Sequence, residues 1–341
     1  MKYRTLGTTG AVVSDISLGT MTFGAEADEA TSHAILDRYV ELGGTFVDTA
    51  DVYGQGASES IVGSWLAGRG GGDDLVIATK ARFPMGDGPN DAGLSRLHLQ
   101  RACHASLRRL GVEAIDLYQL HAWDAATPVQ ETIAALADLV TAGHVRYVGV
   151  SNFTGWQLAL FAAEARHAGL RLATLQPQYN LLAREIEWEL VPACRREGIG
   201  MLPWSPLGGG WLTGKYRRDE RPSGATRLGE DPDRGLEAYD LRDTERTWLV
   251  LDALAAVAGE AGATQAAVAL RWVMDRPQVT APIVGARTVE QLDASLAAVD
   301  VTLDPALVER LDAASAPPTP DYPYGFGART EVAGREVLEA G

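Results

Sequence analysis

The sequence predicts an α/β fold of the (β/α)8 (TIM) barrel type, and three observations lead to this prediction. Short apolar runs alternate with longer amphipathic stretches along the chain. The apolar runs are continuous rather than alternately polar, which is typical of parallel strands covered on both faces. The strand–helix alternation repeats eight times, which is the pattern of this barrel.

Eight short apolar runs are the predicted strands. They cover residues 15–19, 45–49, 75–80, 115–121, 145–152, 172–176, 198–205 and 280–287. Two of the predicted helices between them, 95–111 and 129–143, end at a glycine, which is a common stop signal just past the last helical turn.

Three segments are predicted additions to the barrel. Residues 3–13 read as a β-hairpin around a GTTG turn, able to plug an open end of the barrel. The stretch 206–235, after the seventh strand, is rich in Gly, Pro and charge and is predicted to be a long functional loop. Helices follow it near 243–262 and 264–275, and a further C-terminal helix over 302–315 starts near Asp304 and Pro305.

We expect one domain over residues 1–341, with the barrel at about 3–315 and a C-terminal tail at 316–341. Thirty Lys and Arg residues against 45 Asp and Glu give a net charge of −15. This balance argues against binding to nucleic acid or to anionic membranes. No apolar run approaches the ~18 residues of a membrane span, and the N-terminus lacks a signal core, so we expect a cytoplasmic protein.

Two cysteines, Cys103 and Cys194, lie in predicted helices and predict neither a disulfide framework nor a metal site.

Barrel enzymes carry their active sites at the carboxyl ends of the strands. Asp48, Lys80 and His121 each close an otherwise apolar predicted strand. One polar residue there usually marks only where the chain meets water, but three ionisable residues converging on one mouth predict an active site.

Tyr53 completes this group, because it lies five residues after Asp48 and its loop can turn the phenol over the mouth. A phenol is a poor acid near neutrality, and a neighbouring ammonium such as that of Lys80 is expected to lower its pKa. Asp48 would orient the ammonium, and His121 would donate a hydrogen bond to a carbonyl oxygen as it gains charge. These roles suit carbonyl reduction, in which carbon receives a hydride while oxygen receives a proton.

Eight motifs, in order along the chain, resemble those of the aldo-keto reductase superfamily. They are GTMTFG (19–24), DTADVYG (48–54), LVIATK (75–80), LYQLHAWD (117–124), RYVGVSNF (146–153), LQPQYNLL (175–182), LPWSPLGGGWLTGKY (202–216) and PIVGARTVEQL (282–292). The resemblance implies the same barrel, an extended nicotinamide cofactor and a catalytic tetrad of Asp48, Tyr53, Lys80 and His121. The long loop and the HAWD motif are closer to the bacterial and potassium-channel-β-subunit-like branches.

The resemblance also implies which residues bind the cofactor, expected to be NADPH. Ser151 and Asn152 would bind the carboxamide beside Gln176, and Tyr179 would either stack on the nicotinamide or be a buried strand-end aromatic. The remaining expected cofactor residues are Gly19, Thr20, Met21, Asp48, Trp204, Ser205, Pro206, Leu207, Gly209, Lys215, Arg227, Gly285, Ala286, Arg287, Gln291 and Ser295. No GxGxxG follows a strand, so a Rossmann site is not predicted.

Two positions depart from the family pattern. Where the family usually has a Glu–Asn pair that binds adenine, this chain has Ala294 and Ser295, so weaker adenine recognition is expected. Arg287 stands at the expected 2′-phosphate position and can bind phosphate through two donors. Aromatic and apolar residues expected at the mouth, as walls of a pocket for apolar carbonyl compounds, are Met21, Phe23, Trp123 and Trp211.

Two other interpretations remain beside the reductase. One is a regulatory module that holds the nicotinamide as a ligand and senses redox state with little turnover, as the channel-subunit resemblance allows. The other is an unrelated barrel lyase or hydrolase that binds no nicotinamide, although no carboxylate–His metal cluster marks the strand ends. The expected partner of a reductase is a small-molecule carbonyl substrate, with its identity and the oligomeric state left open.

Overall fold

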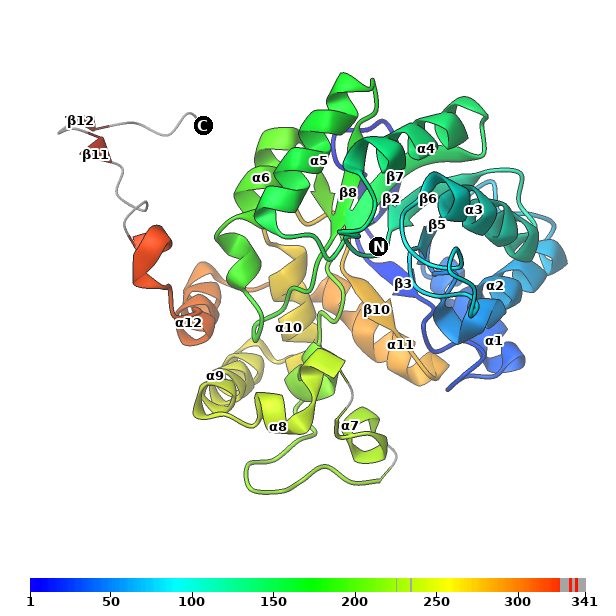
Figure 1. Cartoon of the computed structure of the whole chain (residues 1–341). Coiled ribbons are helices and arrows are strands. Elements are labelled where there is room, and N and C mark those ends of the chain that lie inside the picture. The colour runs from blue at the N-terminus through cyan, green and yellow to red at the C-terminus, as the bar shows by residue number, and fades with distance from the viewer. Residues whose placement is uncertain (225, 234, 326–330, 333–334, 337–341) are drawn as a thin grey trace.

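The computed structural model describes residues 1–224, 226–233, 235–325, 331–332 and 335–336. Its parallel sheet has the strand order β10-β3-β4-β5-β6-β7-β8-β9, and the strands curl around a common axis (Figure 1). They are β3 (Ser17–Gly19), β4 (Phe46–Asp48), β5 (Val76–Ala81), β6 (Ile115–Leu120), β7 (Val145–Ser151), β8 (Leu172–Gln176), β9 (Gly200–Met201) and β10 (Ile283–Gly285). Each overlaps a predicted strand, and the predicted fold class is confirmed.

Backbone hydrogen bonds between the two outer strands of the sheet close the barrel. Met201, the last residue of β9, donates to the carbonyl of Gln278 (2.7 Å) and accepts from the backbone N–H of Thr280 (2.8 Å). Farther along, the N–H of Ile283 in β10 donates to the carbonyl of Pro203 (2.8 Å). The ladder therefore continues around the ring, and the carboxyl ends of all eight strands meet at one mouth.

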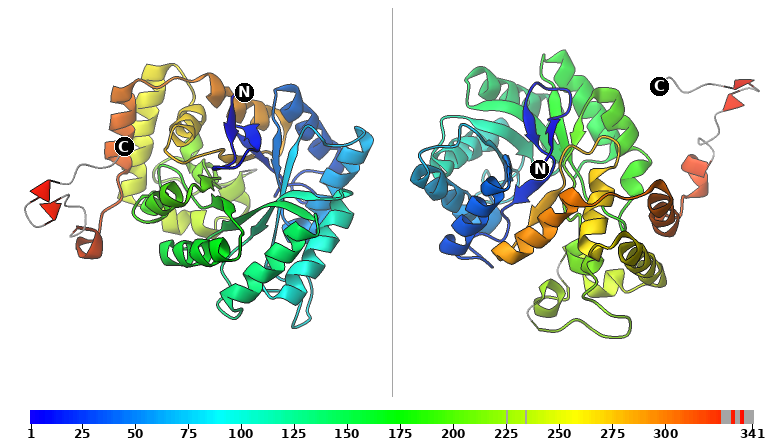
Figure 2. Two further views of the ribbon diagram at one scale, coloured as in Figure 1. Left: turned by 90° about the horizontal axis from the view of Figure 1, so that it is seen from above. Right: turned by 180° about the vertical axis from the view of Figure 1, so that it is seen from behind.

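Helices surround the strands (Figure 2). The helices of at least eight residues are α1 (Glu29–Glu41), α2 (Ala57–Gly68), α3 (Arg96–Leu110), α4 (Val129–Thr141), α5 (Gly155–His167), α6 (Leu190–Glu197), α9 (Glu245–Ala261), α10 (Gln265–Met274), α11 (Val289–Leu296) and α12 (Pro305–Ser315). α3 begins where the Ser95 side chain accepts from the N–H of His98 and ends at Gly111, whose φ of 67° is left-handed.

The N-terminal hairpin closes the end of the barrel at which the strands begin. β1 (Tyr3–Thr5) and β2 (Val12–Ser14) pair antiparallel and lie across this end (Figure 2). Leu6 and Val13 are fully buried and pack against interior side chains of the barrel, among them Phe46 and Leu117. This burial keeps water out of that end, so the mouth at the other end is the open one.

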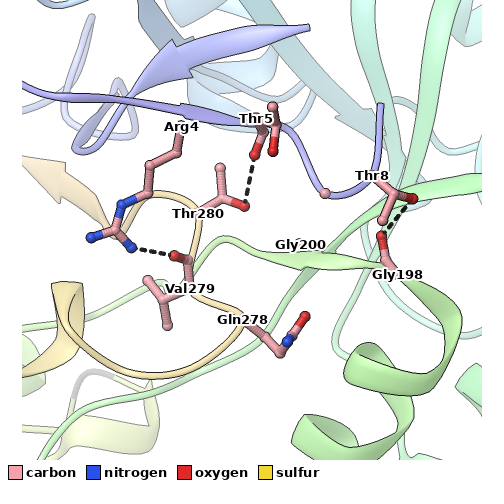
Figure 3. A pocket seen from close by; sticks show the side chains of 9 residues that line it. Arg4, Thr5, Thr8, Gly198, Gly200, Gln278, Val279 and Thr280 are labelled. Carbon is pink, nitrogen blue, oxygen red and sulfur yellow. Dashed lines mark hydrogen bonds between the residues drawn. The ribbon is translucent and has the colours of Figure 1, made fainter. Parts of the chain in front are cut away.

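Polar contacts fix the hairpin to the closing edge of the barrel (Figure 3). Arg4 donates to the carbonyl of Val279 (2.7 Å), Thr8 to that of Gly198 (3.1 Å) and Thr280 to that of Thr5 (3.4 Å). They border a cavity of about 410 Å³ that is also lined by Gly200, the first residue of β9. This cavity therefore lies at the opposite end from the strand-end residues singled out by the sequence.

The sequence predicted a long loop after β9, but the structure places short helices in this segment. It contains η3 (Gly208–Thr213), α7 (Arg227–Glu230), η4 (Gly235–Glu237) and α8 (Tyr239–Arg242), and α7 and α8 lie to one side of the barrel (Figure 1). Trp211 stacks on Tyr239 with ring centroids 5.6 Å apart, and its indole donates to the carbonyl of Glu237 (3.1 Å). Both rings belong to the main hydrophobic core, so these contacts join the segment to the body of the barrel.

Two residues expected in the pocket wall lie in the core instead. Trp211 and Phe23 are both fully buried, so the expectation that they line the mouth is wrong. Each is the large apolar side chain in a segment of small and polar residues, and burying it stabilises the local fold. No single helix among the described residues is long and apolar enough to span a membrane; α9 and α10 pass that test only as a pair bent by 95°.

The hairpin plug generates a prediction about stability. Leu6→Ala should lower the free energy of unfolding by roughly 2–5 kcal/mol, because it leaves a cavity among buried side chains. Val12→Ala in the same hairpin is the matched control, since Val12 is 54% exposed and should change stability by less than about 0.5 kcal/mol. Urea unfolding followed by circular dichroism measures both, and equal unfolding midpoints for the two variants would contradict the plug.

Candidate active site

Adjacent strands bring Lys80 and Asp48 together at the mouth. Asp48 ends β4, and Lys80 stands one residue before the end of the neighbouring β5. The Lys80 ammonium is fully buried and donates to Asp48 Oδ2 (2.6 Å), the carbonyl of Thr49 (2.8 Å) and the hydroxyl of Tyr53 (3.2 Å). All three protons that an ammonium can donate are therefore used.

Two glutamine side chains hold the second oxygen of Asp48. Oδ1 accepts from Nε2 of Gln119 (3.1 Å) on β6 and from Nε2 of Gln176 (2.9 Å), the last residue of β8. The sequence placed Gln176 beside the nicotinamide, and the structure places its amide on Asp48. With both oxygens bound, the carboxylate is fixed in orientation and in turn fixes the ammonium.

Burial and the neighbouring charges shift the pKa values of Lys80 and Tyr53 in opposite directions. Burial alone would lower the pKa of Lys80, but Asp48 and Tyr53 outweigh it and raise that pKa, so the side chain remains an ammonium. Burial raises the pKa of Tyr53, and the charge of Lys80 opposes this without cancelling it. Lys80 therefore lowers the pKa of Tyr53 as expected, but burial outweighs this contribution, the net pKa is raised, and Tyr53 holds its proton at neutral pH.

His121 directly follows β6, and its ring packs beside that of Tyr53. Its ring lies edge-on to those of Tyr53 and Phe83, with centroids 5.8 and 4.7 Å apart. Burial, followed by the charges of Lys80 and Arg82, holds the pKa of His121 well below its usual value. The imidazole is therefore neutral at pH 7 and keeps one N–H for donation. All four tetrad residues of the sequence prediction thus lie together.

Ser151 and Asn152, expected at the carboxamide, lie beside the tetrad. The amide of Asn152 donates to the backbone carbonyl of His121 (2.9 Å), while its oxygen accepts from the indole of Trp204 (3.0 Å). Asn152 has a left-handed φ of 56°, which an Asn tolerates better than most residues. The hydroxyl of Ser151 donates to the carbonyl of Gln176 (2.8 Å). These contacts hold the β7 and β8 ends in register with His121.

Tyr179 is only 2% exposed, its hydroxyl donates to Glu187 (2.7 Å), and its ring packs against Trp272. This placement corresponds to the buried strand-end aromatic, the second of the two interpretations.

Trp123, expected in the pocket wall, lies two residues after His121 and is half-buried, with its ring edge-on to those of Phe153 and Trp156. Phe153 is only 4% exposed and Trp156 is 60% exposed, so Trp123 lies between the buried core and an exposed aromatic ring.

Three cationic side chains gather where the long segment meets the end of β10. Lys215 has a lowered pKa because of burial and then because of the charges of Arg287 and Arg227, so the three cations act on one another. Arg287 donates to both oxygens of Glu230 on α7 (2.9 and 3.1 Å) and lies 3.5 Å from Glu26. The α11 N-terminus begins just after Arg287, which adds a favourable dipole for anions.

Glycines line this cationic group. Gly209 and Gly210 have φ of 63° and 100°, and a Cβ on Gly210 would lie 2.6 Å from Nζ of Lys215. Backbone without side chains beside cationic donors is suited to a phosphate or pyrophosphate. The donor set therefore fits the phosphates of a dinucleotide.

The other expected cofactor residues flank these two groups. The hydroxyl of Thr20, just after β3, donates to the carbonyl of Asp48 (3.1 Å), and that of Ser205 accepts from the N–H of Gly209 (3.0 Å). Gln291 accepts from the N–H of Arg287 (2.9 Å), and Ser295 donates back to the carbonyl of Gln291 (3.1 Å). Of the rest, Gly19, Pro206 and Ala286 are buried, Leu207 is half-buried, and Met21 and Gly285 are exposed.

Comparison with known proteins identifies the family. The model of the aldo/keto reductase family matches residues 15–316. The chain belongs to the aldo/keto reductase family. It is 41% identical to an uncharacterized oxidoreductase, YrpG, of Bacillus subtilis, with 92% of this chain and 95% of the relative covered. It is 36% identical to a probable voltage-gated potassium channel subunit beta of Arabidopsis thaliana, with 92% and 96% covered.

A third relative is the aryl-alcohol dehydrogenase [NADP(+)] of Phanerodontia chrysosporium, which is 33% identical, with 92% of this chain and 86% of the relative covered. This aldo/keto reductase is therefore an oxidoreductase of a family that acts on carbonyl compounds with nicotinamide cofactors. Within the described part of the chain, no group of three or more His, Cys, Asp or Glu is arranged to hold a metal.

Sequence reasoning missed Gln119, the second glutamine on Asp48. A signal for it was present, because Gln119 stands two residues before His121 and residues two apart in a strand share a face. It also missed two buried carboxyl residues near Tyr53. They are Asp51 and Glu59, and their burial depends on how α2 packs.

The Asp48–Lys80 pair of this reductase generates a stability prediction. Lys80→Met leaves the carboxylate of Asp48, which is 2% exposed, buried without a cation, and should lower the free energy of unfolding by roughly 3–5 kcal/mol. The double variant Lys80→Met with Asp48→Asn removes both charges and should recover part of the loss. Guanidinium unfolding compares the three proteins, and a single variant as stable as the parent would overturn this account of the pair.

Proposed function

We propose that this chain is an NADPH-dependent reductase that converts an aldehyde or ketone to the alcohol. The observation that carries the proposal is the hydrogen-bonded series Asp48–Lys80–Tyr53 with the neutral ring of His121 packed edge-on beside the ring of Tyr53. A protonated phenol that accepts a hydrogen bond from an ammonium can act as a general acid, because the ammonium offsets part of the cost of forming the buried phenolate. The relatives named as oxidoreductases support this assignment.

The residues divide the work of one balanced step. The nicotinamide, when bound, supplies the hydride that forms the new C–H bond. Tyr53 gives its proton to the carbonyl oxygen as the C=O π bond breaks, so the product is a neutral alcohol. Lys80 stabilises the phenolate left on Tyr53, and the N–H of His121 donates to the oxygen while it gains charge. Asp48 keeps Lys80 charged and in place.

The substrate we propose is an apolar carbonyl compound. Phe83 lies against His121, and Trp123, two residues after His121, packs edge-on against the exposed Trp156 and the buried Phe153. Trp156 is 60% exposed, so an apolar substrate would cover it on binding. A relative named as an aryl-alcohol dehydrogenase supports aromatic aldehydes as the first compounds to test.

A second candidate function is a regulatory module that binds the nicotinamide and turns over little. The relative named as a probable potassium channel subunit beta favours it. The complete acid assembly at Tyr53 favours the enzyme, because a ligand-binding module has no need of a proton donor. Slow exchange of bound nucleotide together with negligible carbonyl-dependent oxidation would favour the module.

The role of the acid generates a kinetic prediction. Tyr53→Phe removes the donated proton but keeps the ring that packs beside Lys80 and His121. Turnover should fall by at least ~10²-fold, the range for a general acid, while the Kd for NADPH stays nearly unchanged. Single-turnover kinetics and fluorescence titration measure the two quantities. A Phe variant with near-normal turnover in a chemistry-limited assay would remove Tyr53 from the acid role.

The preference for NADPH generates a binding prediction. We propose that the 2′-phosphate replaces Glu230 on Arg287, since both bind through two oxygens. Arg287→Ala should weaken NADPH by roughly 10- to 150-fold, the worth of a hydrogen bond to a charged group, and leave NADH almost unchanged. Glu230→Gln should not weaken NADPH, because it removes the competing charge from Arg287.

Isothermal titration with both nucleotides measures these affinities. Arg310→Ala is the matched control, because Arg310 also pairs with a glutamate, Glu260, but lies on α12. Equal weakening of NADPH and NADH by Arg287→Ala, or a parent protein that prefers NADH, would exclude Arg287 as the phosphate contact.

A further inference from the structure

Asp51 is a buried carboxyl group next to the tetrad that the proposed chemistry does not use. It stands two residues before Tyr53, and its backbone N–H donates to the carbonyl of Lys80 (3.1 Å). The residue is fully buried, and neither carboxylate oxygen makes a well-aligned hydrogen bond to a described residue. A buried acid without such partners is costly when ionised, so its presence here calls for a physical explanation.

The cations near Asp51 are committed to other carboxylates. Arg109 on α3 donates to Oε2 of the fully buried Glu59 on α2 (2.6 Å), and Thr79 donates to the other oxygen of Glu59 (2.6 Å). Lys80 is likewise bound to Asp48. Asp51 therefore has a carboxylate neighbour in Glu59 and no cation of its own among the described residues.

The groups that face Asp51 come from several elements packed around it. They are Glu59 from α2, Arg109 from α3, Lys80 from β5, Tyr118 from β6 and Tyr53 from η1 (Tyr53–Gly56). Burial and then the charge of Glu59 raise the pKa of Asp51 to about 7, although the Val52 N–H, Arg109 and Lys80 each favour the charged form. Burial without a well-aligned partner for either oxygen among the described residues thus favours the protonated acid at Asp51 more than at an aspartate in water.

We propose that Asp51 is a positioning residue of this active site: it acts on Tyr53 and Lys80 through its charge, and gain or loss of that charge shifts the pH range in which Tyr53 holds its proton. This inference rests on the proposed role of Tyr53 as the proton donor. An ionised Asp51 repels a phenolate and so raises the pKa of Tyr53. An uncharged Asp51 removes this repulsion and leaves more of the Lys80 charge to stabilise the phenolate.

As pH rises through the pKa of Asp51, the carboxyl ionises, and Tyr53 then keeps its proton to a higher pH than it otherwise would. The pH range in which Tyr53 is protonated is thereby extended to higher pH. Asparagine has nearly the same shape as aspartic acid but never ionises. In Asp51→Asn the pKa of Tyr53 therefore lacks the upward contribution of an ionised Asp51 at every pH.

The first test is the pH profile of kcat/KM for reduction of an aromatic aldehyde. Asp51→Asn should move the alkaline limb to lower pH by about half a unit or more, as expected for charges within ~10 Å in a medium between water and protein. Asp51→Glu should restore much of the parent limb. A purely structural role would change the height of the profile and leave the limb in place.

Asp116→Asn is the matched control. Asp116 is also a buried aspartate in the barrel wall, but it binds the N–H of Ile77 and the guanidinium of Arg146. This variant should keep the parent limb. An Asp51→Asn limb that coincides with the parent's would overturn the inference, while the proposed function would still stand if Tyr53→Phe had lost its turnover. Near-normal turnover of Tyr53→Phe would instead refute the proposed function.

A second measurement needs no activity. Infrared difference spectra of the parent protein between about pH 5 and 9 should show the C=O band of a protonated carboxylic acid disappearing around neutral pH. The same band should be missing from Asp51→Asn. A parent spectrum without a band that depends on Asp51 would show that the carboxyl does not change its charge, and this result would also overturn the inference.

Discussion

The mouth of this barrel depends on one buried ion pair, the ammonium of Lys80 on the carboxylate of Asp48. A buried ammonium is tolerated only when every proton finds an acceptor and a counter-charge lies beside it. Lys80 meets both conditions through Asp48, Thr49 and Tyr53. Because Gln119 and Gln176 hold the other oxygen of Asp48, strands β4, β5, β6 and β8 are all tied to this pair.

The residues around this pair have the protonation states that carbonyl reduction needs, a neutral His121 and a protonated Tyr53. The ammonium of the pair helps to keep His121 neutral, while burial keeps the proton on Tyr53. Acid and hydrogen-bond donor are thus both prepared before a substrate arrives. The hairpin supports this arrangement from the far end, since Leu6 and Val13 close the barrel interior to water.

The sequence predicted the barrel because continuous apolar strands and capped helices are local signals, and it predicted the tetrad because ionisable residues at strand ends stand out. Gln119 escaped, since its partner Asp48 is defined only by the arrangement of the strands around the barrel. Trp211 was misplaced because an aromatic in a glycine-rich segment looks the same whether it lines a mouth or anchors a loop. The raised pKa of Tyr53 required knowledge of burial. The four-residue helices α7 and α8 are too short for a periodic pattern.

The most direct test of this account is carbonyl-dependent oxidation of NADPH by the full-length protein. It is followed by the near-ultraviolet absorbance of the reduced nicotinamide with a panel of aromatic and aliphatic aldehydes and ketones. The account predicts that the absorbance falls only when a carbonyl compound is added, and that one alcohol forms for each NADPH oxidised. NADPH that binds tightly but is not oxidised with any compound of the panel would contradict the reductase.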